Sequence, residues 1–285
     1  MKGLVPVSLS HIAHHREIVE SKTDSVTKVC VQSVDSKIAA RFTAFEAAVR
    51  ARTLHAFIED ASLQAIGAAL RSCYKSKTKK LYNLLSLIGD TEKNRSLIKC
   101  PYCGITLPKT QDHYLPESKY PELAVHGLNL VPCCSTCNEV KGNRWKRESQ
   151  RFFIHFYSDP IPSDQFLLVT LFSVSSRVAL GTKFSIKKPD RVSSAQWSLI
   201  ENHFNKLDLL SRYEESSAEE IQLAMESCVD HLLEGGKNSS GFLTRIANRL
   251  EVIFGNNHWR VVLLRALALD PIFSSMVKAK KKSST

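Results

Sequence analysis

The sequence predicts an α+β fold in which a predominantly helical chain carries a central ββα unit clamped by cysteines and a small β-hairpin in its C-terminal part. Apolar residues recur every three or four positions on both sides of the centre, as amphipathic helices require. Two Cys-x-x-Cys pairs bracket short extended segments, and a run rich in β-branched and aromatic residues follows. We therefore expect three regions, a helical one at 1–95, the ββα unit at 96–150 and a mostly helical one at 151–285.

The composition describes a globular chain with a basic surface. Of its 285 residues 43% are hydrophobic, which supports a buried core, and the formal net charge is +11, which favours a polyanionic partner such as nucleic acid. No run of about 18 uncharged apolar residues occurs, and the N-terminus lacks a continuous apolar stretch. We therefore expect a cytoplasmic protein with no membrane partner.

The positive charge is concentrated around the cysteines. Residues 71–99 carry eight Lys or Arg against two acids, and residues 141–151 carry five against one. Residues 195–235 hold nine acids and only two basic residues. Basic runs are often solvated helix faces, but two of them flanking a metal-binding motif indicate a nucleic-acid surface.

Residues 35–88 predict a helical scaffold. The first helix begins at Asp35, with Asp35 or Ser36 as its N-cap, and two further helices follow. The inward residues recur at helical spacing and are Ile38, Phe42, Phe45 and Val49, then Leu63, Ile66 and Leu70, then Leu81, Leu84, Leu85 and Ile88. Residues 1–34 are poorly patterned, and His11, His14 and His15 are interpreted as a scattered surface group because no acidic or thiol ligand accompanies them.

The cysteines indicate a metal site. A reducing compartment keeps thiols free, so eight cysteines in a chain of this kind favour metal binding over disulfides. The pairs Cys100/Cys103 and Cys134/Cys137 have the spacing of a structural Cys₄ zinc site, with Cys133 as the less favoured alternative to Cys134. The 31 positions from Cys103 to Cys134 exceed the interval of a simple zinc ribbon, which leaves room for a second function.

That interval carries acid–base and metal-binding residues. Extended pieces around 105–115 and 129–133, followed by a helix from Ser135 to Arg147, form the expected ββα unit. His113 is a natural general base at neutral pH. Its neighbour Asp112 points to the opposite face of the strand and suits a hard cation such as Mg²⁺.

Together these residues resemble the HNH, or ββα-metal, nuclease family in its zinc-braced form. The resemblance covers about 45 residues and rests on Asp-His-x-x-Pro at 112–116, an Asn at 129, the cysteine pairs and the Asn-x-x-Lys-Gly that starts at Asn138. It implies that His113 is the base, that Asn129 orients His113 through a bond to its backbone, and that Asp112 and Asn138 bind Mg²⁺ or Mn²⁺. Many family members have His where this chain has Asn138, which makes it an HNN variant.

Basic residues around the unit are expected to hold a nucleic acid. Lys141 lies one helical turn after Asn138 and is expected to reach a phosphate or the transition state. The other candidates for phosphate contacts are Lys99, Arg144, Lys146 and Arg147. Asn143 is a weaker candidate metal ligand, and His126 a weaker candidate second base.

The C-terminal region predicts a hairpin followed by helices. The run at 165–173 and the segment 183–187 form the two strands, with a turn at Gly181-Thr182. Ser193-x-x-Gln196 and Ser217-x-x-Glu220 have the pattern of capping boxes that begin helices.

The sequence therefore predicts a metal-dependent DNA endonuclease. The alternatives are an RNA-cleaving HNH toxin or effector, and a non-catalytic zinc-finger nucleic-acid-binding protein. No P-loop, kinase or dinucleotide motif appears, so we expect no small-molecule cofactor. The stretch DHYLPESKYPELAVHGLNLVPCC between helical extensions is similar to stand-alone HNH effectors of Septu-type anti-phage systems. That resemblance implies an ATPase partner, for which the acidic segment 195–235 is a candidate docking surface.

Overall fold

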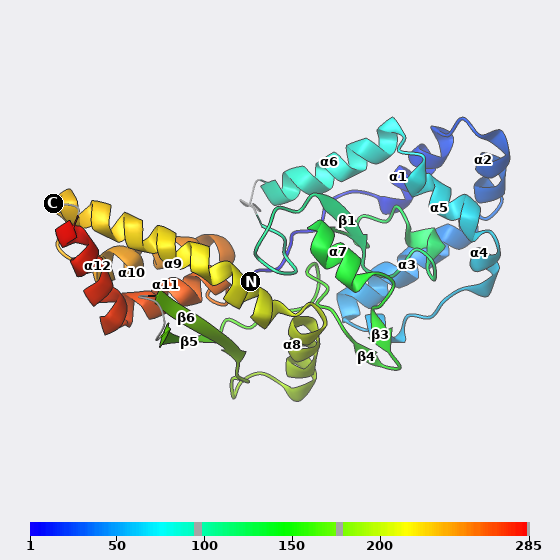
Figure 1. The fold of residues 1–285 in the computed structure, drawn as a ribbon. Helices are drawn as coiled ribbons and strands as arrows, with labels where there is room; N and C mark the ends of the chain where they lie inside the picture. The colour runs from blue at the N-terminus through cyan, green and yellow to red at the C-terminus, as the bar shows by residue number, and fades with distance from the viewer. Residues whose placement is uncertain (94–98, 175–178, 284–285) are drawn as a thin grey trace. The chain divides into compact units, whose positions relative to one another are not determined.

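The computed structural model describes residues 1–93, 99–174 and 179–283, and the chain forms two compact units (Figure 1). One unit spans Gly3–Pro160, and the other joins Met1–Lys2 to Ile161–Thr285. Helices make up most of the described chain, accompanied by small two-stranded antiparallel sheets. The predicted α+β class is confirmed. Part of the basic run 71–99, residues 94–98, lies outside the described residues.

The first unit begins with helices that extend to residue 93. They are α1 (His11–Glu20), α2 (Ser25–Gln32), α3 (Asp35–Ala51), the 3₁₀ turn η1 (Leu54–Ala56), α4 (Ala61–Ala65), α5 (Gly67–Lys75) and α6 (Lys79–Lys93). The first two lie in the segment that lacked a clear pattern. Side chains start both of them, because Ser10 accepts a hydrogen bond from the Ala13 amide and Asp24 accepts one from each of Val26 and Thr27.

The predicted core stripe of α3 is confirmed, since Ile38, Phe42, Phe45 and Val49 are all buried. Its predicted cap is wrong. The helix follows Val34 without a side-chain cap, and the Asp35 carboxylate binds the Arg16 guanidinium instead, at 2.6–3.1 Å. The second predicted helix is interrupted at Ile66, whose ψ of 19° separates α4 from α5.

The ββα unit follows. Its hairpin pairs β1 (Thr110–His113) with β2 (Leu130–Cys133), with His113 opposite Leu130 and Thr110 opposite Cys133. The 3₁₀ turn η2 (Pro121–Leu123) lies in the connection, and α7 (Ser135–Lys141) lies beside β1 (Figure 1).

The helix was predicted to reach Arg147, and this was wrong. Gly142 takes a positive φ of 49° and ends α7. The chain then forms a short hairpin of β3 (Lys146–Arg147) and β4 (Gln150–Arg151). Arg144 and Trp145 therefore do not share a helix face with Asn138 and Lys141.

The second unit contains the predicted C-terminal hairpin. Its strands are β5 (Leu167–Val174) and β6 (Ala179–Ile186), paired antiparallel. The expected turn at Gly181-Thr182 is wrong, because both residues lie inside β6. Gly181 is opposite Phe172, and a Cβ at this glycine would lie 2.5 Å from the Phe172 ring. The glycine therefore makes room for an aromatic ring across the sheet. The connection at 175–178 lies outside the described residues.

Five helices complete this unit: α8 (Ser194–Lys206), α9 (Leu209–Leu233), α10 (Ser239–Phe254), α11 (Trp259–Leu269) and α12 (Pro271–Ser283). Ser193 caps α8 as predicted, by accepting a hydrogen bond from the Gln196 amide. Ser217-x-x-Glu220 begins no helix and lies within α9, where Glu220 binds Arg260 at 2.8 Å. None of the described helices is both long and apolar enough to span a membrane.

Candidate active site and metal centre

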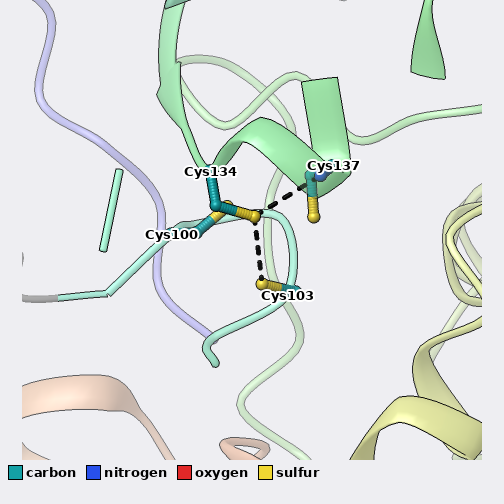
Figure 2. Close-up of side chains that lie close together, drawn as sticks. All are labelled: Cys100, Cys103, Cys134 and Cys137. Atoms are coloured by element: carbon teal, nitrogen blue, oxygen red, sulfur yellow. Dashed lines mark hydrogen bonds between the residues drawn. The ribbon is translucent and has the colours of Figure 1, made fainter. Parts of the chain in front are cut away.

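Four cysteine side chains meet where the loop before β1 contacts the start of α7. The Sγ atoms of Cys100, Cys103, Cys134 and Cys137 all lie within 4.8 Å of one another, and all four residues are buried. Figure 2 shows the Cys134 sulfur turned toward Cys103 and toward the backbone amide of Cys137. The fold thus brings the two Cys-x-x-Cys pairs, which are far apart in the sequence, into one cluster.

Local backbone geometry shapes the first pair. Gly104 takes a φ of 70°, which returns its amide to the Cys100 carbonyl at 2.7 Å. The Ile105 amide donates to the Cys103 sulfur at 3.4 Å. Cys134 is the N-cap of α7, and its sulfur accepts the Cys137 amide at 3.4 Å. Backbone N–H groups therefore face two of the sulfurs, as in a zinc knuckle.

The cluster fits a structural zinc ion. Tetrahedral Zn–S bonds of about 2.3 Å place neighbouring sulfurs about 3.8 Å apart, and the Cys103 and Cys134 sulfurs lie 3.9 Å apart. Hydrogen bonds from Cys100, Cys103 and Cys137 lower the pKa of the Cys134 thiol, while the same network raises the pKa of Cys100 and of Cys137. The positive end of α7 favours the same thiolate form, which is the form that binds metal. The four residues can therefore hold zinc.

Cys133, the alternative to Cys134, is oriented elsewhere. Its side chain is buried beside Thr110, whose Oγ1 lies 3.3 Å from the Cys133 sulfur. Burial raises the pKa of this thiol to about 12, so it stays protonated. Its environment is that of a core residue.

Asp112 lies inside the unit, on the face of β1 opposite to His113. The residue is only 2% exposed. Its Oδ2 accepts a hydrogen bond from the Tyr102 hydroxyl at 2.7 Å, and its Oδ1 accepts one from the Lys141 ammonium at 2.9 Å. The carboxylate is thus held by two donors that come from the knuckle and from α7.

Lys141 is fully buried, so its ammonium faces protein rather than solvent. It donates to Asp112 Oδ1 and also to the His113 carbonyl, each at 2.9 Å. These contacts link the last turn of α7 to the end of β1. Lys141 therefore lies next to the backbone of the candidate base, while its predicted contact with phosphate remains a prediction.

Asn138, the predicted partner of Asp112 in binding a cation, lies on the same helix. Its Nδ2 donates to Thr110 Oγ1 at 3.2 Å and to the Gln111 carbonyl at 3.5 Å. The amide oxygen is therefore directed away from these two acceptors. Asn138 and Lys141 both contact β1, as expected for residues one helical turn apart.

His113 ends β1 with one ring nitrogen fixed. Its Nε2 lies 2.9 Å from the Ala124 carbonyl oxygen, which can only accept, so Nε2 carries the proton and Nδ1 keeps its lone pair. The Tyr74 ring of α5 packs edge-on against the imidazole, with centroids 4.6 Å apart. Burial lowers the pKa of His113, an effect opposed by the bond to Ala124 and by Glu117, whose Oε2 lies 3.9 Å from Nε2. A neutral imidazole with a free Nδ1 is the form a general base requires.

Asn129 organises the loop after His113 without touching the His113 backbone, contrary to the expected bond. Its Oδ1 accepts from the Leu115 amide at 2.7 Å, and its Nδ2 donates to the carbonyls of Leu115 and Leu123 at 3.0 and 3.2 Å. Its own carbonyl accepts the amide of Tyr114 at 2.9 Å. Asn129 binds the Leu123 carbonyl, and the next carbonyl along the chain, that of Ala124, binds the His113 ring. Asn129 therefore positions His113 indirectly, through its neighbour in the loop.

The candidate phosphate-binding residues differ in how free they are. Lys99 donates to the Ile105 carbonyl at 2.7 Å, and Lys146 donates to the His55 carbonyl at 2.6 Å. Arg144 is exposed, although its guanidinium contacts the Val140 carbonyl, and Arg147 is exposed on β3. The two arginines are therefore better placed than the two lysines to reach a ligand.

Three residues of the site were not selected from the sequence. Tyr102 lies inside the first Cys-x-x-Cys pair, and Glu117 follows His113 by four positions, so both had a local signal. Tyr74 had none, because α5 reaches His113 only in the folded unit. Lys77, whose ammonium lies 3.8 Å from the centroid of the Tyr74 ring, brings part of the basic run 71–99 to the same place. His126, considered as a second base, is buried away from solvent and contacts Glu46.

This arrangement of hairpin, helix, cysteines and histidine falls within one recognisable segment. Residues 100–144 match the family model for HNH endonucleases. The resemblance stated from the sequence is confirmed for this HNH segment, and the match supports a nuclease that acts on a nucleic acid.

Two curated proteins share parts of the chain. Protein ea31 of Escherichia phage lambda is 44% identical over 63 residues, which are 21% of this chain and 21% of that protein. Septu protein PtuB of Bacillus thuringiensis is 41% identical over 49 residues, which are 15% of this chain and 19% of that protein. The chain thus spans about a fifth of the length of each of these relatives. No solved structure matches it.

The two adjacent cysteines provide a matched test of the metal centre. Cys134→Ser removes a sulfur of the cluster, and we expect loss of bound zinc together with a large loss of stability, because zinc binding contributes to folding free energy. Cys133→Ser changes a buried thiol that contacts Thr110, and it should keep the zinc of the four-cysteine site, and so the zinc content of the wild type. Metal analysis and thermal unfolding of both variants check this. Equal zinc content in the two variants would contradict the assignment.

The buried pair of Asp112 and Lys141 gives a second test. Lys141→Met leaves a buried carboxylate without its cation, which costs about 3–5 kcal/mol of unfolding free energy. Adding Asp112→Asn should restore much of that loss, since the unpaired charge is then gone. Arg144→Met, on an exposed neighbour, should change stability by less than about 0.5 kcal/mol. Urea unfolding of wild type, the single variants Lys141→Met and Asp112→Asn and the double variant measures the coupling, and strictly additive effects would show that the pair does not interact.

Proposed function

We propose that this protein is a metal-dependent HNH endonuclease that hydrolyses phosphodiester bonds of DNA. The observation that carries the proposal is His113, whose Nε2 is held by the Ala124 carbonyl so that Nδ1 is left with a lone pair. This histidine lies inside the segment that matches the HNH endonuclease family. A non-catalytic zinc finger would need the four cysteines but would have no use for a histidine fixed in this way.

In the proposed reaction His113 Nδ1 takes a proton from the water that attacks phosphorus. As the new P–O bond forms, the bond to the leaving sugar oxygen breaks, and that oxygen takes a proton from solvent. The resulting imidazolium is stabilised by Glu117, since a carboxylate near Nε2 favours the charged ring. Asn129 and Lys141 act as positioning residues, because they fix the loop and the His113 carbonyl.

We assign the predicted hard cation, Mg²⁺ or Mn²⁺, to Asp112 and Asn138. Carboxylate and amide oxygens are the donors such ions prefer. The buried Asp112 carboxylate is negatively charged and is paired with the Lys141 ammonium at 2.9 Å, which supports its proposed role as a cation ligand. A divalent ion would supply charge stabilisation to the phosphate and to the leaving oxygen.

The nucleic acid is proposed to approach from the side of Tyr74 and Lys77. The Lys77 ammonium lies over the Tyr74 ring, which packs against His113. Arg71 and Lys75 belong to α5, the helix that carries Tyr74. Exposed Arg144 and Arg147 add positive charge after α7. Such contacts bind the backbone of either DNA or RNA and carry no sequence information. RNA is therefore the alternative substrate.

We further propose that the nuclease serves in anti-phage defence under the control of an ATPase partner. This rests on the similarity of the chain to Septu protein PtuB and on the Septu-like layout of its HNH segment. The acidic segment 195–235 is the proposed docking surface. Three of its glutamates are already used within the second unit, since Glu214 binds Lys183 at 3.2 Å, Glu220 binds Arg260 and Glu226 binds Lys280. The available charge is therefore carried by residues such as Glu215 and Glu219, which are exposed.

A nicking assay tests the catalytic proposal. The full chain, purified from its source with the proteins that accompany it, is incubated with plasmid and Mg²⁺ or Mn²⁺, with RNA in parallel. We expect His113→Ala to lose about 10²–10⁴-fold in rate, the usual effect of removing a general base. His55→Ala, at an exposed histidine, should keep full activity.

Three results would count against the proposal. Cleavage by His113→Ala at the wild-type rate would remove His113 from the reaction, and cleavage of RNA alone would replace the proposed substrate. The pH profile gives the third. Burial lowers the pKa of His113 below its ordinary value of 6.5, so the imidazole is neutral at pH 6.5 and above. The rate should therefore fall only at pH values below 6.5. An acid limb above pH 6.5 would point to another group.

A charge-reversal pull-down tests the docking surface. Glu215→Lys with Glu219→Lys should abolish co-purification of the ATPase, because both side chains point to solvent and reversing them replaces attraction by repulsion. Asp190→Lys, at an exposed position outside the segment 195–235, shows whether loss of charge alone is sufficient. Unchanged association of the double variant would exclude α9 as the docking site.

A further inference from the structure

A second group of metal-binding side chains lies apart from the four cysteines. His11 comes from α1, Glu46 from α3, and His126 from the loop between η2 and β2. One possible ligand atom from each residue lies within 4.8 Å of the other two. No sequence motif joins them, since successive members are 35 and 80 positions apart.

The three side chains are enclosed by the fold. His11 is 7% exposed and His126 is fully buried, and their rings lie 4.1 Å apart between centroids. His126 Nε2 lies 3.3 Å from Glu46 Oε1. His11 Nδ1 is buried, and no residue in the described part of the chain offers it a hydrogen bond. The interpretation of His11 as part of a scattered surface group is therefore wrong, because the fold buries it and supplies the missing acid.

The donor set has a recognisable chemistry. Two imidazoles and one carboxylate bind zinc in sites that leave a coordination position open, and the same set suits other borderline divalent ions. A cavity of about 450 Å³ is lined by His11 and Glu46 together with Arg50, Arg52 and Tyr157. It gives room for a water molecule or a small anion on that open position. Burial lowers the pKa of His11 and of His126 to about 3, so both rings are neutral at pH 7.

We propose that His11, Glu46 and His126 bind a divalent ion of the zinc class, separate from the Cys₄ site. The ion would join α1 and α3 to the loop that carries Asn129. A neutral, packed histidine pair is the competing explanation, since the rings of Phe42 and Phe45 lie edge-on against His126 with centroids 4.5 and 4.9 Å away. Packing alone, however, gives no partner to the buried Nδ1 of His11.

The site is connected to the candidate active site through two hydrogen bonds. The Asn129 amide donates to the His126 carbonyl at 2.8 Å, and the Leu128 amide donates to His126 Nδ1 at 3.2 Å. An ion on Nε2 moves the ring proton to Nδ1, which then repels the Leu128 amide. Metal binding must therefore rearrange the 126–129 turn, and Asn129 in that turn holds Leu115 and Leu123. This gives the ion a route to the loop that positions His113.

Cobalt substitution tests the proposal on the full chain. Co²⁺ in the Cys₄ site gives an intense thiolate-to-metal charge-transfer band, whereas Co²⁺ bound by His and Glu gives only weak visible bands. With Mg²⁺ in excess to fill the cation site proposed at Asp112 and Asn138, we expect wild type to take up two equivalents of Co²⁺, the second without a gain in the charge-transfer band. Glu46→Gln keeps the shape of the side chain but removes its charge, and it should bind the second equivalent at least tenfold more weakly. His14→Gln, on the same helix as His11, should bind both equivalents as wild type does.

The charge-transfer band also shows that each variant is folded around its cysteines. Uptake of a single equivalent by wild type would overturn the proposal without any variant, as would a second equivalent that Glu46→Gln binds as tightly as wild type. If Glu46→Gln does not fold, His11→Gln replaces it with the same expected loss.

Discussion

Four cysteine sulfurs come together from two Cys-x-x-Cys pairs, with 31 positions between Cys103 and Cys134. The hairpin they enclose has strands of only four residues each, and a two-stranded hairpin of that size is marginal in water. A metal ion bound by the four cysteines would therefore fix the knuckle at one end and the start of α7 at the other more firmly than the sheet does. Everything that follows in the site depends on that fixed distance, because Tyr102 comes from the knuckle and Lys141 from the helix that Cys134 caps.

Within this frame the two neighbours Asp112 and His113 have opposite environments. The alternation of a strand turns Asp112 inward to Tyr102 and Lys141, and His113 toward Ala124 and Tyr74. Burial supports a neutral base on one face and a paired carboxylate on the other. The Lys141 ammonium bridges the faces, since it bonds both to Asp112 and to the His113 carbonyl. A change in the contact between Lys141 and Asp112 would thus be transmitted directly to the end of β1, where His113 lies.

Much of this was predictable from local pattern. The Cys-x-x-Cys spacing, the stripe of α3 and the cap at Ser193 depend on residues close in sequence, and each is present as expected. The errors arose where distant residues decided the outcome. Gly181 suggests a turn until Phe172 is found opposite it, and Ser217-x-x-Glu220 suggests a helix start until α9 is seen to run through it. Glu46 and Tyr74 reach the histidines only through tertiary packing, so no local signal could have identified them.

Hydrogen exchange of the Leu115 amide tests the dependence on the metal centre most directly. This amide donates to Asn129 Oδ1 at 2.7 Å in the loop that positions His113, and it contacts no cysteine. If the cluster fixes the unit, removing zinc with a chelator from the Glu46→Gln variant, in which the proposed second metal site is weakened, should abolish its protection, along with that of the Tyr114 amide. The β5–β6 ladder of the second unit should stay protected and serves as the internal control. Unchanged protection at Leu115 after zinc is fully removed would contradict the account.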